Sequence, residues 1–198
     1  MNDMIPDSTN RIASIIGLLL HPFLVAVITL LIVLSDLPLT TAIKWTTIIS
    51  ISLIMPLTSM IIFMKHRQQY TYQRHERGRL YLIGWLSIAF CLLIIILFDG
   101  PDILQACMAA LLVWTPAQAF INARFTKVST HVAVLSGCAV GVLWIKAWYL
   151  PVIWLTLIGM IALVAWARIV TRHHTLQQVL LGVLTGTLSV SLVFMLML

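Results

Sequence analysis

Residues 151–198 have the sequence PVIWLTLIGMIALVAWARIVTRHHTLQQVLLGVLTGTLSVSLVFMLML, in which two long apolar segments flank one short polar cluster. The apolar segments, 151–168 and 177–197, approach or reach the roughly 20 residues that an α-helix needs to cross a bilayer. Arginine, histidine and glutamine side chains make up the cluster between them. Because charge at membrane depth costs roughly 2.5–3.5 kcal/mol per residue, a chain that retains such a cluster is expected to use it.

The whole chain has the composition of an integral membrane protein. It has 198 residues, of which 61% are hydrophobic and 9% are charged, and its mean hydropathy is +1.05. A soluble domain is about half apolar and about a quarter charged. A net charge of +6 would suggest nucleic acid in a soluble chain. In a membrane protein, topology signals and anionic lipid headgroups account for it, so we expect a lipid bilayer and no nucleic acid as partner.

Seven segments are long and apolar enough, or nearly so, to span a membrane. They are 12–34, 43–64, 80–98, 103–121, 131–148, 151–168 and 177–197. The run Asp-Gly-Pro-Asp at 99–102 predicts a turn. We therefore predict one integral membrane domain over residues 1–198, an all-α polytopic transmembrane helix bundle. It has seven spans, or six if one segment is re-entrant or lies along the membrane surface.

The alternation of seven spans places every polar cluster on one side of the membrane. That side holds the N-terminus with residues 65–79, 122–130 and 169–176, and all the basic residues except Lys44 and Lys146. The positive-inside rule then assigns this side to the cytoplasm. We expect an integral protein of the bacterial inner (plasma) membrane whose polar clusters converge at its cytoplasmic face.

The upstream cluster has the sequence Lys127-Val128-Ser129-Thr130-His131. Ser129 immediately precedes an apolar run and is a good helix N-cap, which places His131 in the first turn. The backbone N–H groups of a helix N-terminus bind anions, and Lys127 adds a positive charge. The alternative for this cluster alone is an ordinary capped helix that carries a histidine by chance.

The downstream cluster joins two apolar segments. Arg168 ends the first segment and offers a forked donor suited to phosphate oxygens. His174 and Gln178 are four residues apart and share a face of a helix, where the amide oxygen can accept from one imidazole nitrogen and so determine which nitrogen is free. Together these residues suggest phosphoryl transfer through a phosphohistidine. The alternative is a basic patch that contacts lipid headgroups.

The two clusters resemble the second and third signature motifs of the type 2 phosphatidic acid phosphatase (PAP2) superfamily, P-S-G-H and S-R-x5-H-x3-D. The P-S-G-H motif matches Val-Ser-Thr-His at 128–131. The S-R-x5-H-x3-D motif matches Ala-Arg at 167–168, followed by His174 and then by Gln178. The resemblance covers roughly residues 122–198, and two apolar segments separate the motifs, as in that family.

The resemblance implies a mechanism and a role for each matched residue. His174 matches the nucleophile that takes the phosphoryl group, and His131 matches the acid that protonates the leaving oxygen. Arg168 matches a phosphate ligand, and Ser129 with the backbone N–H of Thr130 completes the phosphate cradle. The resemblance implies no metal or other cofactor, because basic side chains then provide the charge stabilisation that Mg²⁺ supplies elsewhere.

The chain departs from the family pattern at several points. Gln178 stands where the family has a carboxylate, and an amide cannot stabilise an imidazolium as a carboxylate does. Thr130 replaces the glycine of the cradle. The first family motif, K-x6-R-P, is absent as written, and we predict that Arg77 with Arg74 takes its place as a phosphate ligand. A cytoplasmic site also differs from the orientation ascribed to many PAP2 members.

The expected function is hydrolysis of a lipid phosphate or isoprenoid diphosphate by a PAP2-like membrane phosphatase. A membrane site suits a substrate whose tail stays in the bilayer while its headgroup meets the basic cluster. Two alternatives remain open. One is a non-catalytic protein that binds or transports lipid phosphates, which Gln178 favours, and the other is a phosphotransferase that uses the same histidine. The sequence names neither the lipid nor the oligomeric state.

Overall fold

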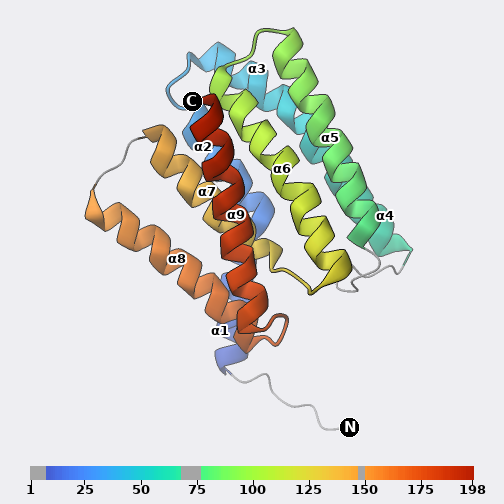
Figure 1. Cartoon of the computed structure of the whole chain (residues 1–198), viewed down its shortest axis with the longest axis vertical. Helices are drawn as coiled ribbons and strands as arrows, with labels where there is room; N and C mark the ends of the chain where they lie inside the picture. The colour runs from blue at the N-terminus through green and yellow to red at the C-terminus, as the bar shows by residue number, and fades with distance from the viewer. Residues whose placement is uncertain (1–7, 68–76, 147–149) are drawn as a thin grey trace. The chain divides into compact units, whose positions relative to one another are not determined.

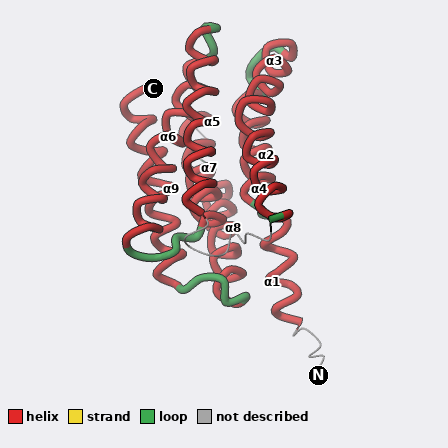
Figure 2. Tube along the Cα trace, turned by 90° about the vertical axis from the view of Figure 1, so that its right-hand side faces the viewer, coloured by secondary structure: helices red, strands yellow, loops and turns green. Residues whose placement is uncertain are grey.

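The computed structural model describes residues 8–67, 77–146 and 150–198. In this part of the chain every regular element is a helix, and Figure 2 shows no strand. The all-α prediction is therefore confirmed. The helices are α1 (Ser8–Leu19), α2 (Pro22–Leu34), α3 (Leu39–Ile49), the π-helical turn η1 (Ser50–Ile54), α4 (Met55–His66), α5 (Arg77–Leu97), α6 (Asp102–Arg124), α7 (Thr130–Lys146), α8 (Pro151–Val170) and α9 (Leu176–Met197).

Five of the described helices are long and apolar enough to cross a membrane, so the chain is a membrane protein. They are the continuous helix Leu39–His66, Gly78–Leu97 within α5, and α6, α8 and α9. A sixth span results if α1 and α2 are counted together, although these two helices are bent by 41° at the break between them. The remaining predicted segment, α7, is apolar but has only 17 residues. Within the described residues each of the seven predicted segments is thus largely helical, but the segment 12–34, predicted as one span, is broken between Leu19 and Pro22.

The outer surfaces of these helices suit a lipid environment. On α8, the side chains of Leu155, Ile158 and Leu163 are 69%, 58% and 44% exposed. Monomeric soluble proteins rarely expose contiguous apolar surface on this scale. In a bilayer the same side chains face hydrocarbon, which is as apolar as they are.

Contacts group the described residues into two compact units, and both combine segments that are distant in the sequence. The first unit draws on Met1–Thr29 and Val128–Thr187, and the second on Leu30–Lys127 and Leu188–Leu198. In the first unit α1 and α7 both pack against α8 (Figure 1). Its core is formed by Val25, Val132, Leu135, Val164 and Val179.

The second unit is organised around the antiparallel pair α5 and α6, with η1 and α4 packed on α5. A polar cluster joins α5 to α6, because the side-chain amides of Asn122 and Gln118 donate to the Tyr81 hydroxyl at 2.6 and 3.1 Å. Hydrogen bonds of this kind hold helices together where no water competes.

The predicted turn at 99–102 is present between α5 and α6. Asp99 adopts a left-handed conformation (φ 49°), and the N–H of Gly100 donates to the carbonyl of Ile95 at 2.7 Å. This is the hydrogen-bonding pattern of a Schellman motif, which ends a helix by satisfying its last carbonyls. A Cβ atom at Gly100 would lie 2.5 Å from Ile95 and 2.8 Å from Trp45, so this position requires glycine.

Candidate functional site

A second Schellman motif ends α8 and determines where the downstream cluster begins. Arg172 adopts the left-handed conformation (φ 54°) that glycine usually occupies at this position. Its N–H donates to the carbonyl of Ile169 at 2.9 Å, and the N–H of His173 donates to the carbonyl of Arg168 at 3.2 Å. The N–H of His174 donates to that same Arg168 carbonyl at 3.1 Å. The backbone therefore ties Arg168 to His174 across the five intervening residues.

A capping box begins α9 immediately after this turn. Thr175 is the N-cap and Gln178 the third residue of the helix. The Gln178 Oε1 atom accepts from the Thr175 N–H at 3.3 Å, and the Thr175 Oγ1 atom accepts from the Gln178 N–H at 3.4 Å. This reciprocal pair satisfies two backbone donors that a helix start leaves unpaired. The amide at position 178 therefore has a structural role that sequence analysis did not assign to it.

The same amide oxygen contacts the imidazole of His174. The His174 Nδ1 atom lies 3.0 Å from the Gln178 Oε1 atom, so the predicted pairing of these side chains is present. The contacting atom must be oxygen, because the Thr175 N–H also donates to it. Nδ1 therefore carries the hydrogen in the neutral ring, and Nε2 carries the lone pair that a nucleophile needs.

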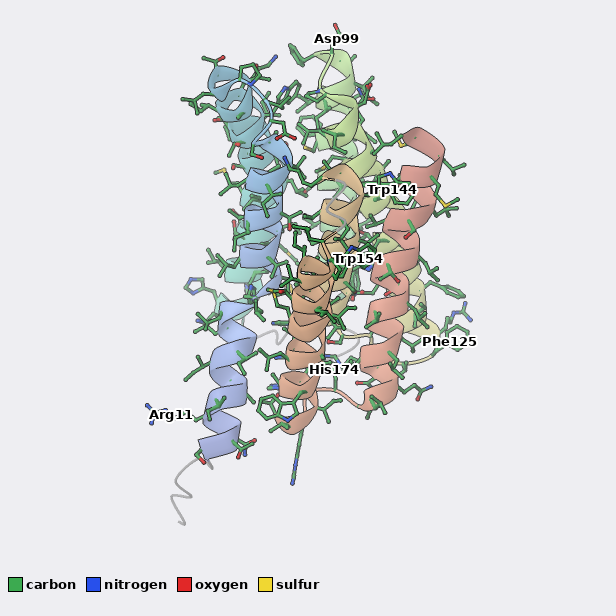
Figure 3. All side chains as sticks on the ribbon, turned by 90° about the vertical axis from the view of Figure 1, so that its left-hand side faces the viewer. Arg11, Asp99, Phe125, Trp144, Trp154 and His174 are labelled. Carbon is green, nitrogen blue, oxygen red and sulfur yellow. The ribbon has the colours of Figure 1, made fainter. Side chains whose placement is uncertain are left out.

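The position of His174 differs in one respect from the prediction. His174 precedes the first residue of α9 by two positions, so it shares no helical face with Gln178. The capping box brings the two side chains together by folding the amide back over the helix start. His174 is only 7% exposed, and Figure 3 shows it where α8 meets α9, with Trp154 toward the other end of α8.

The upstream cluster lies against the start of α9. The N–H of Ser129 donates to the carbonyl of Gln178 at 3.1 Å, and the carbonyl of Ser129 accepts from the N–H of Ala133 at 3.0 Å. Ser129 thus occupies the N-cap position of α7, as predicted. This backbone hydrogen bond places the upstream cluster directly beside the downstream cluster.

The side chain of Ser129 does not make the predicted capping bond. Ser129 is fully buried, and within the described residues its Oγ atom has no hydrogen-bond partner. The hydroxyl therefore does not stabilise α7 as an N-cap side chain would. A buried polar atom without a partner costs about 1–3 kcal/mol, and a ligand oxygen would satisfy it.

Two glycines on α9 allow the close approach of α7. A Cβ atom at Gly182 would lie 2.8 Å from the carbonyl oxygen of Ser129, and one at Gly186 would lie 3.0 Å from the Oγ atom of Ser136. Glycines four residues apart are the usual sign of closely packed membrane helices. The sequence contains this signal at Gly182-x3-Gly186, and our sequence analysis did not use it.

His131 lies in the first turn of α7, as predicted, and its ring contacts a second histidine from the N-terminal region. The rings of His131 and His21 meet edge to face, with centroids 5.3 Å apart and planes at 85°. Arg168, His21, His174 and His173 are all close enough to His131 to interact with it electrostatically. Three predicted site residues, His131, Arg168 and His174, therefore lie near one another. His21 was not among the predicted site residues, although a His-Pro pair within an apolar segment is an unusual signal.

Arg168 lies near the end of α8 and beside α1. Its Nη1 atom would be 3.7 Å from a Cβ atom at Gly17, which is an ordinary van der Waals distance. The N-terminal helix therefore packs beside Arg168 in the first unit. The sequence resemblance, which begins near residue 122, did not include this helix.

For the other predicted phosphate ligands the structure gives less information about the side chains. Thr130 is the first residue of α7 and is half-buried. Lys127 is half-buried, ends a segment of the second unit and precedes Ser129 by two residues. Arg77 begins α5, but its side chain is not described, and Arg74 lies outside the described residues. Their predicted roles remain predictions.

The described part of the chain contains no group of three or more histidine, cysteine or acidic side chains placed to hold a metal ion. The candidate site is instead a cluster of imidazoles, one guanidinium, one amide and one buried hydroxyl at a helix N-terminus. Such a set can bind an anion and offer it a nucleophilic nitrogen. Comparisons of the chain with protein-family models, with curated proteins and with solved structures found no match.

Proposed function

We propose that the protein is a membrane phosphatase that hydrolyses a lipid phosphate or an isoprenoid diphosphate through a phosphohistidine at His174. One observation carries the proposal: the Gln178 amide oxygen holds Nδ1 of His174, which leaves the lone pair on Nε2. Arg168, a phosphate-binding type of side chain, is tied to His174 through the backbone. The resemblance to the PAP2 motifs points to the same chemistry.

In the first step the Nε2 atom of His174 attacks phosphorus. A nitrogen–phosphorus bond forms, the bond from phosphorus to the leaving oxygen breaks, and His131 gives that oxygen a proton. Arg168 and the N-terminus of α7 stabilise the charge that develops on the phosphoryl oxygens. The positive charge of Arg168 disfavours a proton on His131. The negative charge of a bound phosphate group opposes this effect and favours the protonated ring.

In the second step water attacks phosphorus and gives a proton to His131. The nitrogen–phosphorus bond breaks, inorganic phosphate leaves, and both histidines return to their starting states. No metal enters either step. The amide of Gln178 orients His174 in both, but it stabilises the charged phosphoimidazole less than a carboxylate would, so a low turnover rate is expected.

A membrane environment supports the proposed substrate class. Within the first unit, α8 exposes large apolar side chains that suit contact with lipid. A substrate with a hydrocarbon or isoprenoid tail remains in the bilayer while its phosphate reaches the N-terminus of α7. The protein is proposed to lie in the bacterial inner (plasma) membrane, with the site at the cytoplasmic face because of the excess of basic residues there.

The decisive experiment measures phosphate release and covalent labelling with the detergent-purified protein. A panel of lipid phosphates and polyprenyl diphosphates is offered without added metal and with a chelator, and labelled phosphate is trapped on the protein during a single turnover. The proposal expects release from at least one substrate and an acid-labile label that disappears in His174→Ala. Lipid phosphate binding without label or release would show that the protein only binds or transports its ligand. Transfer of the label to an added alcohol in preference to water would show a phosphotransferase.

The role of His131 has a separate test. A general acid matters most when the leaving oxygen is strongly basic. His131→Ala is expected to slow the release of phosphate from an alkyl phosphate by about 10²-fold or more. It is expected to slow the hydrolysis of p-nitrophenyl phosphate much less. Equal losses on the two substrates would show that His131 only shapes the site.

The cytoplasmic orientation is tested by labelling single cysteines in intact cells. Asp99→Cys and Arg172→Cys are introduced in turn into a background in which Cys91, Cys107 and Cys138 are replaced by alanine. Both positions are exposed. An impermeant reagent is expected to label the cysteine at 99 from outside and to leave the one at 172 unlabelled. The reverse pattern would place the site on the outer face.

A further inference from the structure

His21 lies at the break between α1 and α2 and acts as the N-cap of α2. Pro22 begins the helix, where its missing N–H is no loss. The carbonyl of His21 accepts from the N–H of Val25 at 3.0 Å, and its Nδ1 atom accepts from the N–H of Phe23 at 3.4 Å. Histidine is an unusual residue at this position, where serine, threonine, aspartate and asparagine are preferred.

These contacts determine the state and the orientation of the His21 ring. Because Nδ1 accepts from a backbone N–H, the neutral ring carries its hydrogen on Nε2. The ring also stacks on Phe23, with centroids 5.6 Å apart and planes at 15°. A rotation of the ring would therefore lose a hydrogen bond and a stacking contact together.

The ring that is held in this way meets His131 edge to face at 5.3 Å. The core of the first unit holds the two helix starts together, because Val25 of α2 clusters there with Val132 and Leu135 of α7. The start of α2 and the start of α7 are thus packed together by buried apolar side chains. The meeting of the two histidines is a consequence of that packing.

We propose that His21 is a positioning residue that holds the imidazole of His131 in the orientation it needs to exchange a proton with the leaving oxygen. The proton exchange rests on the proposed function, but the positioning does not. The side chain has to meet two requirements at once. Asparagine could cap α2 but would not fill the space against His131, and phenylalanine could fill that space but would not cap.

Because capping α2 and packing against His131 are separate requirements, two variants can test them independently. His21→Asn keeps a capping oxygen and removes the ring, whereas His21→Phe keeps a ring and removes the cap. Positioning predicts that His21→Asn slows alkyl phosphate hydrolysis by about 10-fold or more, with a much smaller effect on p-nitrophenyl phosphate, and that His21→Phe is the less impaired of the two. If His21 is only a cap, His21→Asn retains full activity and His21→Phe loses activity equally on both substrates, and the proposal is wrong.

A second measurement is independent of any enzymatic activity. The protein is labelled with ¹⁵N-histidine, and the imidazole signals of His131 are assigned by their loss in His131→Ala. In His21→Asn these signals are expected to shift and broaden, as the ring samples several orientations. His66→Asn, which changes an exposed histidine of α4, is the control and is expected to leave them unchanged.

The two measurements distinguish the failure of each proposal. A parent protein that releases phosphate from no substrate, together with His131 signals that change in His21→Asn, would remove the phosphatase proposal and keep the positioning role. His131 signals that are the same in the parent and in His21→Asn would overturn the positioning role, whatever the activity of the parent.

Discussion

The turn between α5 and α6 and the turn between α8 and α9 have the same backbone design and different side chains. Both end the first helix with a Schellman motif, and both place a non-glycine residue in the left-handed conformation, Asp99 in one and Arg172 in the other. The first turn has four residues between its helices, 98–101, and the second has five, 171–175. The additional residue is His174.

The two turns also differ at the residue whose carbonyl receives the Schellman bond. In the α5–α6 turn it is Ile95, which is fully buried, and in the α8–α9 turn it is Arg168. An apolar side chain is therefore sufficient for this way of ending a helix. Neither Arg168 nor His174 is required by the backbone, so their presence in an apolar chain calls for a reason other than folding. The proposed phosphate chemistry supplies that reason.

The strongest test of this comparison changes His174 and, separately, Pro101 in the other turn, which has no residue equivalent to His174. His174→Ala is expected to lower phosphate release by about 10⁴-fold or more, as losses of a nucleophile do, because no other group forms the bond to phosphorus. Pro101→Ala is expected to keep normal activity. Substantial turnover in His174→Ala, measured on the best substrate of the panel, would show that the comparison does not mark an active site.

A change at Arg168 tests the second difference between the turns. Arg168→Lys keeps the positive charge but loses the planar fork, and the rate is expected to fall by roughly 10²–10³-fold, as when one transition-state donor is removed. Ile95→Val in the other turn is the matched control. It is expected to cost roughly 0.5–1.5 kcal/mol of stability with no change in rate. Arg168→Lys with parental kinetics would reduce Arg168 to a contact with lipid headgroups.

Gln178 can be tested in both of its roles, as a cap and as the partner of His174. Gln178→Leu removes both, and the rate is expected to fall by roughly 10²-fold. Gln178→Glu keeps a capping oxygen and restores a carboxylate, so it is expected to retain or raise the rate. Thr175→Ala weakens only the cap, at a cost of roughly 1 kcal/mol, and serves as the control. If thermal unfolding and activity fall in parallel in Gln178→Leu and Thr175→Ala, the amide acts only as a cap.

The smallest effect is expected where the two turns are most alike. Arg172→Gly and Asp99→Gly remove the strain of a non-glycine residue in the left-handed conformation, roughly 1–2 kcal/mol. The greater freedom of glycine in the unfolded chain offsets part of that gain. Each change is expected to stabilise the protein by under about 1 kcal/mol, with no effect on activity. A loss of stability in either variant, measured by unfolding in detergent, would show that the side chain makes a contact that outweighs the strain.

Hydropathy was sufficient to predict the helices, because each long apolar run buries its backbone polar groups within itself. The apolar run after Ser129 placed that residue at a helix start, and the spacing of four residues paired His174 with Gln178. These patterns could not show that the Ser129 hydroxyl lacks a capping bond or that His174 precedes its helix. The burial of Ser129 depends on how closely α7 approaches α9, which Gly182 and Gly186 permit. The position of His174 depends on the Schellman motif and the capping box between α8 and α9.

His21 illustrates a different limit of sequence-based prediction. The residue is 110 positions from His131, and no spacing rule connects them. The bend at Pro22 and the packing of Val25 on Val132 bring the rings together. Only the tertiary arrangement identifies this histidine as part of the site.

The oxygen atom that begins α9 is the same atom that holds His174, and this has a consequence for the motions of the site. When the first turn of α9 frays, the Thr175 N–H and the His174 imidazole lose their hydrogen bonds to this oxygen in a single event. The orientation of the ring is therefore coupled to the integrity of the first turn. Hydrogen exchange at the Thr175 amide follows the opening of that turn, so a measurement on a backbone proton reports on the hydrogen bond that orients the ring.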